Sequence, residues 1–125
     1  MRVQVSLRAQ REDGKSRPLV VFVASELVAW YFHFAMDVRA HIVIRGIVQG
    51  VGFRYYAANQ ASKLNLYGYA RNLFNGDVEV EVEGERGSIE EFIKMLAIGP
   101  RLAKVDDVVV QWERYTGKYR TFEIR

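Results

Sequence analysis

The sequence contains no cysteine and only two histidines and two prolines in 125 residues. The absence of cysteine excludes disulfides, thiolate nucleophiles and cysteine-ligated zinc or iron–sulfur sites, so any chemistry must use oxygen and nitrogen groups. An excess of one charge is also missing. With 18 basic and 15 acidic side chains the net charge is +3, too small by itself to indicate a nucleic-acid or membrane partner. Half of the residues are hydrophobic, which is typical of one folded domain.

A long uninterrupted apolar run is lacking as well. The segment from Leu19 to Met36 comes nearest, but it falls short of the roughly 20 apolar residues of a spanning helix and contains Glu26 and His33. It offers no clean small-residue cleavage site of the kind that follows a signal peptide. We therefore expect no stable membrane span.

Residues 1–35 differ in character from the rest, and we expect an N-terminal extension over 1–35 and a domain over 36–125. The extension has no role in chemistry if Met36 is the natural start. Alternatively, residues 19–24 form a strand, or residues 25–36 form a helix capped by Ser25, that packs on the domain or on a second copy. Otherwise its aromatic residues would form an apolar patch that favours self-association through the extension: Trp30, Tyr31, Phe32 and Phe34.

From residue 39 onward the spacing of apolar residues predicts regular elements. Residues 41–47 alternate as a strand, and apolar residues at helical spacing over 53–64 predict an amphipathic helix. Two further strands over 67–73 and 78–83 are joined through Asn75-Gly76, a strong hairpin signal. Ser88 and Glu91 form a capping box that opens a second helix, which Gly99-Pro100 ends. Residues 105–112 and 119–124 are the last two strands.

The predicted order is βαββαβ plus a short C-terminal strand. Both helices carry one apolar stripe and should therefore cover the same face of one sheet, which predicts an α+β, ferredoxin-like two-layer sandwich with an N-terminal extension. In the strand over 78–83, valine alternates with Glu79, Glu81 and Glu83. Three carboxylates on one face could suggest a metal site, but we expect a face exposed to water.

The stretch GIVQGVGFR, residues 46–54, is the most informative part of the sequence. Its glycines allow positive φ and consecutive inward N–H groups, and the following helix directs its positive end to the same place. Arg54, in the first helical turn, is electrostatically disfavoured there unless an anion binds. A tight turn beside a solvated arginine would explain the stretch equally well. It matches neither the dinucleotide fingerprint nor the nucleotide-binding loop, so nucleotide binding is disfavoured.

Together with GYARN at 68–72, NGDVEVEVEG at 75–84 and Gly99-Pro100, this stretch closely resembles the acylphosphatases over residues 39–125. The resemblance implies a cytoplasmic enzyme that hydrolyses small acyl phosphates to a carboxylate and inorganic phosphate, without metal or cofactor. It further implies that Arg54 binds the phosphate and that Asn72 positions the attacking water. The N–H groups that cradle the phosphate would come from Gln49, Gly50, Val51, Gly52 and Phe53.

The chemistry of these side chains suits the implied roles. A guanidinium can hold two phosphate oxygens at once, and an asparagine, though too weakly basic to be a general base, can orient water toward a good leaving group. Tyr69 and Ala70 depart from the family's usual aromatic, often Trp, followed by Val; both are packing positions. A non-catalytic anion-binding or interaction module on the same fold is the alternative, in which Asn72 is an ordinary polar residue at a strand end.

Other candidates are weaker. His33 and His41 lack the spacing of metal ligands and are expected to be ordinary surface or edge residues. Asp106 and Asp107 should point to opposite faces of a strand, which argues against a shared-proton pair. Four tyrosines flank the two motifs and are candidates for a substrate mouth, although core packing is the safer interpretation for Tyr56: Tyr55, Tyr56, Tyr67 and Tyr69. Basic and acidic residues nearly balance over 36–125, so no nucleic-acid partner is expected.

Overall fold

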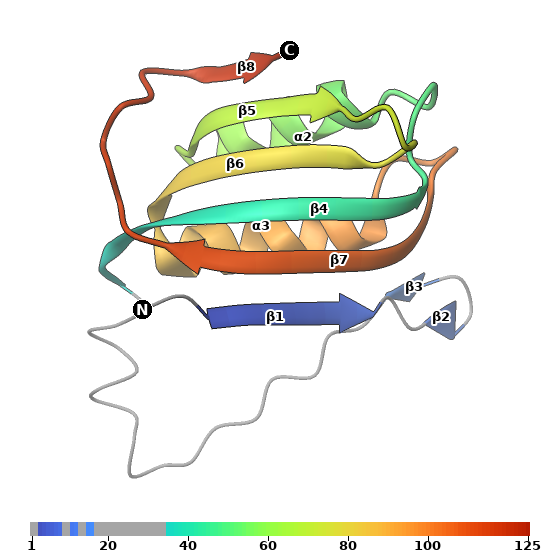
Figure 1. Ribbon diagram of the computed structural model, residues 1–125, viewed down its shortest axis with the longest axis horizontal. Helices are drawn as coiled ribbons and strands as arrows, with labels where there is room; N and C mark the ends of the chain where they lie inside the picture. Colours follow the sequence, from blue (N-terminus) through green and yellow to red (C-terminus); the bar gives the residue numbers. More distant parts are fainter. Residues whose placement is uncertain (1–2, 9–10, 13–14, 17–34) are drawn as a thin grey trace, which may run out of the picture.

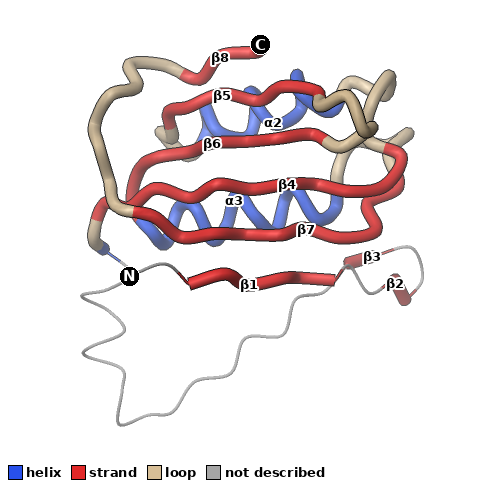
Figure 2. Tube along the Cα trace, viewed as in Figure 1, coloured by secondary structure: helices blue, strands red, loops and turns tan. Residues whose placement is uncertain are grey.

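The computed structural model describes residues 3–8, 11–12, 15–16 and 35–125. Two helices lie on one face of a six-stranded sheet, which confirms the predicted ferredoxin-like sandwich (Figures 1 and 2). The elements are β1 (Val3–Arg8), β2 (Arg11–Glu12), β3 (Lys15–Ser16), β4 (Asp37–Ile47), α2 (Phe53–Lys63), β5 (Tyr67–Asn72), β6 (Val78–Glu85), α3 (Arg86–Ile98), β7 (Lys104–Glu113) and β8 (Phe122–Ile124).

The strand order is β1-β7-β4-β6-β5-β8. Both β4 and β5 pair antiparallel with β6, so they run parallel to each other and end at the same edge, on the right of Figure 1. Ile44 of β4 and Asn72 of β5 face the same residue of β6, Val78. The loop that follows β4 and the residue that ends β5 therefore meet at one edge of the sheet.

The core lies between the helices and the sheet. Alternate residues of the central strands face this layer, and Ile42 and Ile44 of β4 and Val80 of β6 are completely buried in it. Phe53 at the start of α2 and Phe92 of α3 are the largest side chains that pack against them. The alternate apolar residues of the strands and the apolar stripes of the two helices thus pack together in one layer.

The second helix begins earlier than predicted. α3 starts at Arg86, its N-cap residue is Glu85, and no side chain caps it. Ser88 and Glu91 lie inside the helix, so the predicted capping box is wrong. The cause lies in tertiary contacts. β6 leads directly into α3, and the Arg86 N–H donates to the Met36 carbonyl oxygen at 3.0 Å, which satisfies one of the first-turn N–H groups that have no partner within the helix.

The predicted water-exposed face of β6 is also wrong, because Glu79, Glu81 and Glu83 are 9%, 8% and 2% exposed. The connection between β7 and β8, residues 114–121, contributes groups that bind this face and runs along one end of the sheet (Figure 1). Hydrophobic alternation predicts which residues face away from the core but not that a later segment covers them. Among the described residues no group of three or more His, Asp or Glu side chains is arranged to hold a metal ion.

Each of the three carboxylates has several partners. Glu79 accepts hydrogen bonds from Arg71 and from the Tyr69 hydroxyl, the latter at 3.0 Å, and Glu81 binds Arg39 and Tyr119.

His41 is predicted at the surface or at an edge of the sheet: it lies on the inner strand β4, with its side chain 32% exposed and its Nε2 2.9 Å from Oε2 of Glu79.

Glu83 fastens the β7–β8 connection to the sheet. Its Oε2 accepts hydrogen bonds from the Thr116 N–H at 2.6 Å and the Thr116 hydroxyl at 2.7 Å, and its Oε1 accepts one from the Gly117 N–H at 3.0 Å. A buried carboxylate with three donors is a strong anchor, because hydrogen bonds to a charged group exceed neutral ones.

The N-terminal extension contributes a strand that the sequence did not predict: β1 pairs antiparallel with β7 from Val3–Trp112 to Arg8–Asp107. The strand considered at 19–24, most of the helix considered at 25–36, and His33 lie outside the described residues. In the described part of the chain, no helix has the length and apolar character needed to cross a membrane.

Replacing Glu83 by Ala should lower the free energy of unfolding by about 2–3 kcal/mol, because three donors at residues 116 and 117 lose a buried acceptor. Urea unfolding measures this. Glu91→Ala is the matched control: its carboxylate pairs with Lys94 on an exposed helix surface, so the change should stay within about 0.5 kcal/mol. Equal effects of the two substitutions would contradict an anchoring role for Glu83.

Stability should fall in acid through Glu79 and Glu81. Burial alone would raise the pKa of each carboxyl, but hydrogen bonds from His41, Arg71 and Tyr69 to Glu79, and from Tyr119 and Arg39 to Glu81, outweigh it. Both pKa values therefore lie below the ordinary 4.5.

A depressed pKa contributes stability above the unfolded-state pKa, and this is lost as the pH falls from 4.5 through the folded-state values. The free energy of unfolding by urea should decline over this range, and less steeply in a Glu79→Gln, Glu81→Gln double variant. A double variant as acid-sensitive as the wild type would exclude these carboxylates as the cause.

Candidate functional site

The loop of residues 48–52 joins β4 to α2. Gly50 and Gly52 adopt φ of 72° and 78°, a left-handed conformation that glycine adopts without strain. A Cβ built on either glycine would meet nothing within 4 Å. Glycine is therefore favoured at these two positions by the positive φ and not by a lack of space for a side chain, and the space beside this backbone is open. Val48 before the loop and Phe53 after it are almost completely buried, so both ends of the loop are fixed to the core.

The start of α2 faces this loop. Its N-cap residue, Gly52, has no side chain to accept from the first-turn N–H groups, and the first turn contains no acidic residue. Uncapped N–H groups and the positive end of the helix dipole together favour an anion at this position.

Gln49 links the loop to the β5–β6 turn. Its Nε2 donates to the Leu73 carbonyl oxygen at 2.7 Å and to the Asp77 carbonyl oxygen at 2.8 Å. The sequence motif implies a role for the backbone of this residue but gives no sign of these side-chain contacts. No local signal could have shown them, because both acceptors are main-chain atoms more than 20 residues away. The contact holds the loop beside Leu73, the residue that follows Asn72.

Arg54 lies in the first turn of α2 and is partly exposed. Its Nη1 donates to the Arg125 main-chain oxygen at 2.9 Å, and the Arg125 N–H donates to the Ala70 carbonyl oxygen of β5 at 2.8 Å. The guanidinium is therefore held toward the ends of β5 and β8. Only one of the five N–H donors of this group has a partner among the described residues, which leaves others available to a ligand.

Asn72 is the last residue of β5, and its side chain is exposed. The structure thus brings the loop, Arg54 and Asn72 to the same edge of the sheet, through Gln49 on one side and Arg125 on the other.

The tyrosines are more scattered than expected. The Tyr69 ring is buried, the Tyr56 hydroxyl donates to the Met95 carbonyl oxygen at 2.8 Å, and Tyr67 lies at the start of β5, away from this edge. Tyr55 is exposed next to Arg54.

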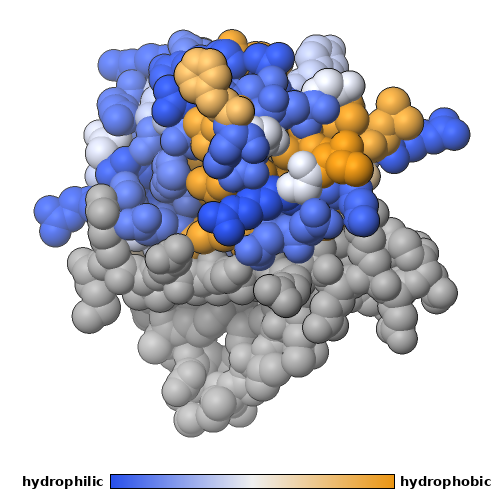
Figure 3. Space-filling model, turned by 45° about the vertical axis from the view of Figure 1, so that its right-hand side comes forward, coloured by the Kyte–Doolittle hydropathy of each residue, from blue (hydrophilic) through white to orange (hydrophobic). Residues whose placement is uncertain are grey.

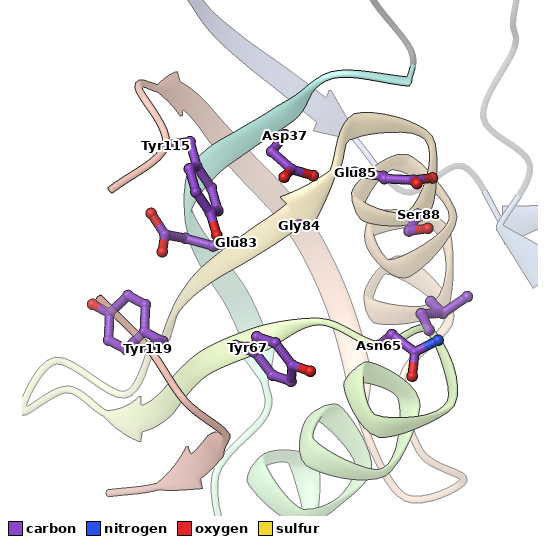
Figure 4. A pocket seen from close by; sticks show the side chains of 10 residues that line it. Asp37, Asn65, Tyr67, Glu83, Gly84, Glu85, Ser88, Tyr115 and Tyr119 are labelled. Carbon is purple, nitrogen blue, oxygen red and sulfur yellow. The ribbon is translucent and has the colours of Figure 1, made fainter. Parts of the chain in front are cut away.

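A cavity of about 260 Å³ lies at the opposite end of the sheet, where β6 ends and β4 begins (Figure 4). Tyr67, Tyr115 and Tyr119 line it together with Asp37 and Glu83. None of its lining residues belongs to the predicted site, so this cavity is separate from the loop and Asn72.

The comparison with protein families matches residues 40–124 to the acylphosphatase model. The chain belongs to the acylphosphatase family. The acylphosphatase of Vibrio vulnificus is 55% identical over 82 residues, which are 66% of this chain and 90% of the relative. That of Moorella thermoacetica is 48% identical over 88 residues, 70% of this chain and 94% of the relative. The family resemblance and the enzyme class predicted from the sequence are thereby confirmed.

Solved structures agree with this assignment. The crystal structure of acylphosphatase from Bacillus subtilis has a TM-score of 0.69 and 33% identity, and the match covers 70% of this chain and 98% of that one. Full-length HypF, in its phosphate- and nucleotide-bound form, has a TM-score of 0.64 and 35% identity over 72% of this chain and 12% of its own. The acylphosphatase fold and family identify the chain as an enzyme that hydrolyses acyl phosphates.

Gln49→Ala should lower the free energy of unfolding by about 1–2 kcal/mol, because two part-buried hydrogen bonds from the side-chain amide to main-chain oxygens are lost. With the loop released from the β5–β6 turn, inhibition of acyl phosphate hydrolysis by inorganic phosphate should also weaken. Urea unfolding and inhibition constants measure the two effects. Gln60→Ala on α2 is the control, and an unchanged inhibition constant in Gln49→Ala would show that the contact does not shape the site.

Proposed function

We propose that this acylphosphatase holds the phosphoryl group of its substrate in the 48–52 loop, with Arg54 as phosphate-binding residue and Asn72 as the residue that positions water. The observation that carries the proposal is the convergence of three elements at one edge of the sheet: the loop after β4, the first turn of α2 and the end of β5. The N–H donors of the cradle belong to Gln49, Gly50, Val51, Gly52, Phe53 and Arg54.

Electrostatics support the role of Arg54. A cation in the first turn of a helix is disfavoured by about 0.3–1 kcal/mol, since it lies at the positive end of the dipole. A dianion between the guanidinium and the N–H groups of the loop reverses the sign of that interaction. Phosphoryl transfer depends on positioning and on neutralising the oxygens of the transferred group, and a planar guanidinium can bind two of them together.

The position of Asn72 suits a water-orienting role. Its amide is exposed at the end of β5, one residue before Leu73, whose carbonyl oxygen binds Gln49 of the loop. The amide oxygen can accept a hydrogen bond from water while the NH₂ group donates to a phosphoryl oxygen. Asparagine is too weak a base to remove a proton, but the leaving carboxylate needs no protonation. The water's proton therefore passes to the departing carboxylate or to the phosphate.

In this proposal neither a metal nor a cofactor takes part, and the small molecules at the site are an acyl phosphate and its product, inorganic phosphate. A cytoplasmic location stays a prediction, as do the absence of a nucleic-acid partner and self-association through the extension.

Arg54→Ala and Asn72→Ala should each lower kcat for acetyl phosphate about 10²–10³-fold, the loss typical of removing one group that stabilises the transition state. Arg54→Lys should recover little, because an ammonium cannot bind two oxygens in one plane. Steady-state kinetics with and without EDTA measure these effects, and EDTA should leave the wild-type rate unchanged.

Arg120→Ala and Asn59→Ala, at exposed positions, are the matched controls and should retain full activity. Wild-type activity in Arg54→Ala or Asn72→Ala would contradict the assigned roles, and loss of activity in EDTA would contradict the metal-free mechanism. A wild-type protein that phosphate protects against heat, but that turns over no acyl phosphate, would instead indicate an anion-binding module.

A further inference from the structure

Three exposed apolar side chains lie on segments that flank the 48–52 loop, at the edge where β4 and β5 end. Ile47 directly precedes the loop, Phe74 lies in the β5–β6 turn, and Leu102 lies in the turn before β7. Phe74 is fully exposed, and the other two are more than half exposed. Figure 3, which brings this end of the molecule forward, shows apolar side chains gathered there. We call Ile47, Phe74 and Leu102 the apolar rim.

Contacts in the structure hold both turns of the rim beside the loop. Gln49 of the loop donates to the carbonyl oxygens of Leu73 and Asp77, which are the two ends of the turn that carries Phe74. On the other side, Gly99 is so close to α2 that a Cβ on it would lie 3.2 Å from Cε2 of Phe53, the first residue of the helix. Ile47 pairs with Lys104, two residues after Leu102. The rim thus borders the proposed phosphate site on two sides.

The rim contributes little to the fold itself. A side chain stabilises a folded domain by leaving water, and the Phe74 ring remains entirely in water. Single exposed apolar residues need no explanation, but several together beside a binding loop mark a surface that contacts a ligand. Phe74 also stands in a turn with Asn75 and Gly76, where polar residues are typical.

We propose that the apolar rim binds the acyl group of the substrate and makes the enzyme prefer acyl phosphates with a long aliphatic or aromatic acyl group. This inference rests on the proposed function, because it takes the phosphoryl group to lie in the loop. The acyl group is joined to that phosphorus through a single bridging oxygen, so it leaves the loop within a few ångströms and reaches the surrounding side chains.

The rim touches a part of the substrate that does not react. Its contribution is therefore the same in the ground state and the transition state, and it should appear in KM more than in kcat. If roughly 60 Å² of apolar surface leaves water when a longer chain contacts the rim, kcat/KM should rise about tenfold. Inorganic phosphate has no acyl group, so its inhibition constant should not depend on the rim.

The test compares acetyl phosphate with hexanoyl phosphate, which share the same reacting bond and differ in chain length. The wild type should favour hexanoyl phosphate about tenfold in kcat/KM, mainly through KM. Phe74→Ala and Leu102→Ala should each bring this ratio closer to one, and Phe74→Leu should keep most of it. Met36→Ala removes a similarly exposed apolar side chain at the opposite end of β4 and should leave the ratio unchanged.

A ratio near one in the wild type, or the same ratio in wild type and both alanine variants, would overturn the role of the rim while hydrolysis of acetyl phosphate still supports the proposed function. Failure of the wild type to hydrolyse either compound would overturn the proposed function and the inference together. Phosphate inhibition that changes in Phe74→Ala would also count against the inference, since it would place Phe74 at the phosphate and not at the acyl group.

Discussion

The pairing of β6 with both β4 and β5 is the constraint on which the site depends. Two strands that run antiparallel to a common neighbour run parallel to each other, so the loop after β4 and the end of β5 must meet at one edge. The connection between β4 and β5 passes through α2, which returns the chain to the start of β5, so that residues more than 15 positions apart in the sequence come together at the ends of the two strands. The buried ends of the loop, Val48 and Phe53, and the side chain of Gln49 then fix its position.

The second organising feature is the layer of carboxylates on the face of the sheet away from the helices. Glu83 holds Thr116 and Gly117, and Glu81 holds Tyr119, so the chain between β7 and β8 is fastened across the sheet. β8 can then pair with β5 and bring the Arg125 main-chain oxygen to Arg54. The anchoring of residues 116 and 117 by Glu83 and the orientation of the Arg54 side chain by Arg125 are therefore linked through the C-terminal segment, although the two contacts lie far apart along it.

Much of the fold could be predicted from local pattern. The helices, the hairpin at Asn75-Gly76 and the two-layer arrangement follow from hydrophobic period and turn chemistry, and the structure confirms them. The predictions that were wrong share one cause, which is a contact between residues far apart in the sequence. Local sequence predicts a cap at Ser88 because it does not show that the Met36 carbonyl oxygen binds the Arg86 N–H. It predicts a water-exposed Glu83 because the residues that bind this carboxylate, Thr116 and Gly117, lie more than 30 positions away. The side-chain contacts of Gln49 could not be foreseen for the same reason.

The pairing of β1 with β7 has a consequence for how molecules of this protein meet one another. Without β1, β7 would be the outermost strand, with a row of unpaired N–H and C=O groups along a valine-rich segment. Such an edge is a template for a strand from another molecule, and covering it is a common protection against aggregation. Because β1 forms hydrogen bonds with these groups of β7, the outermost strand on this side of the sheet is β1, which belongs to the extension.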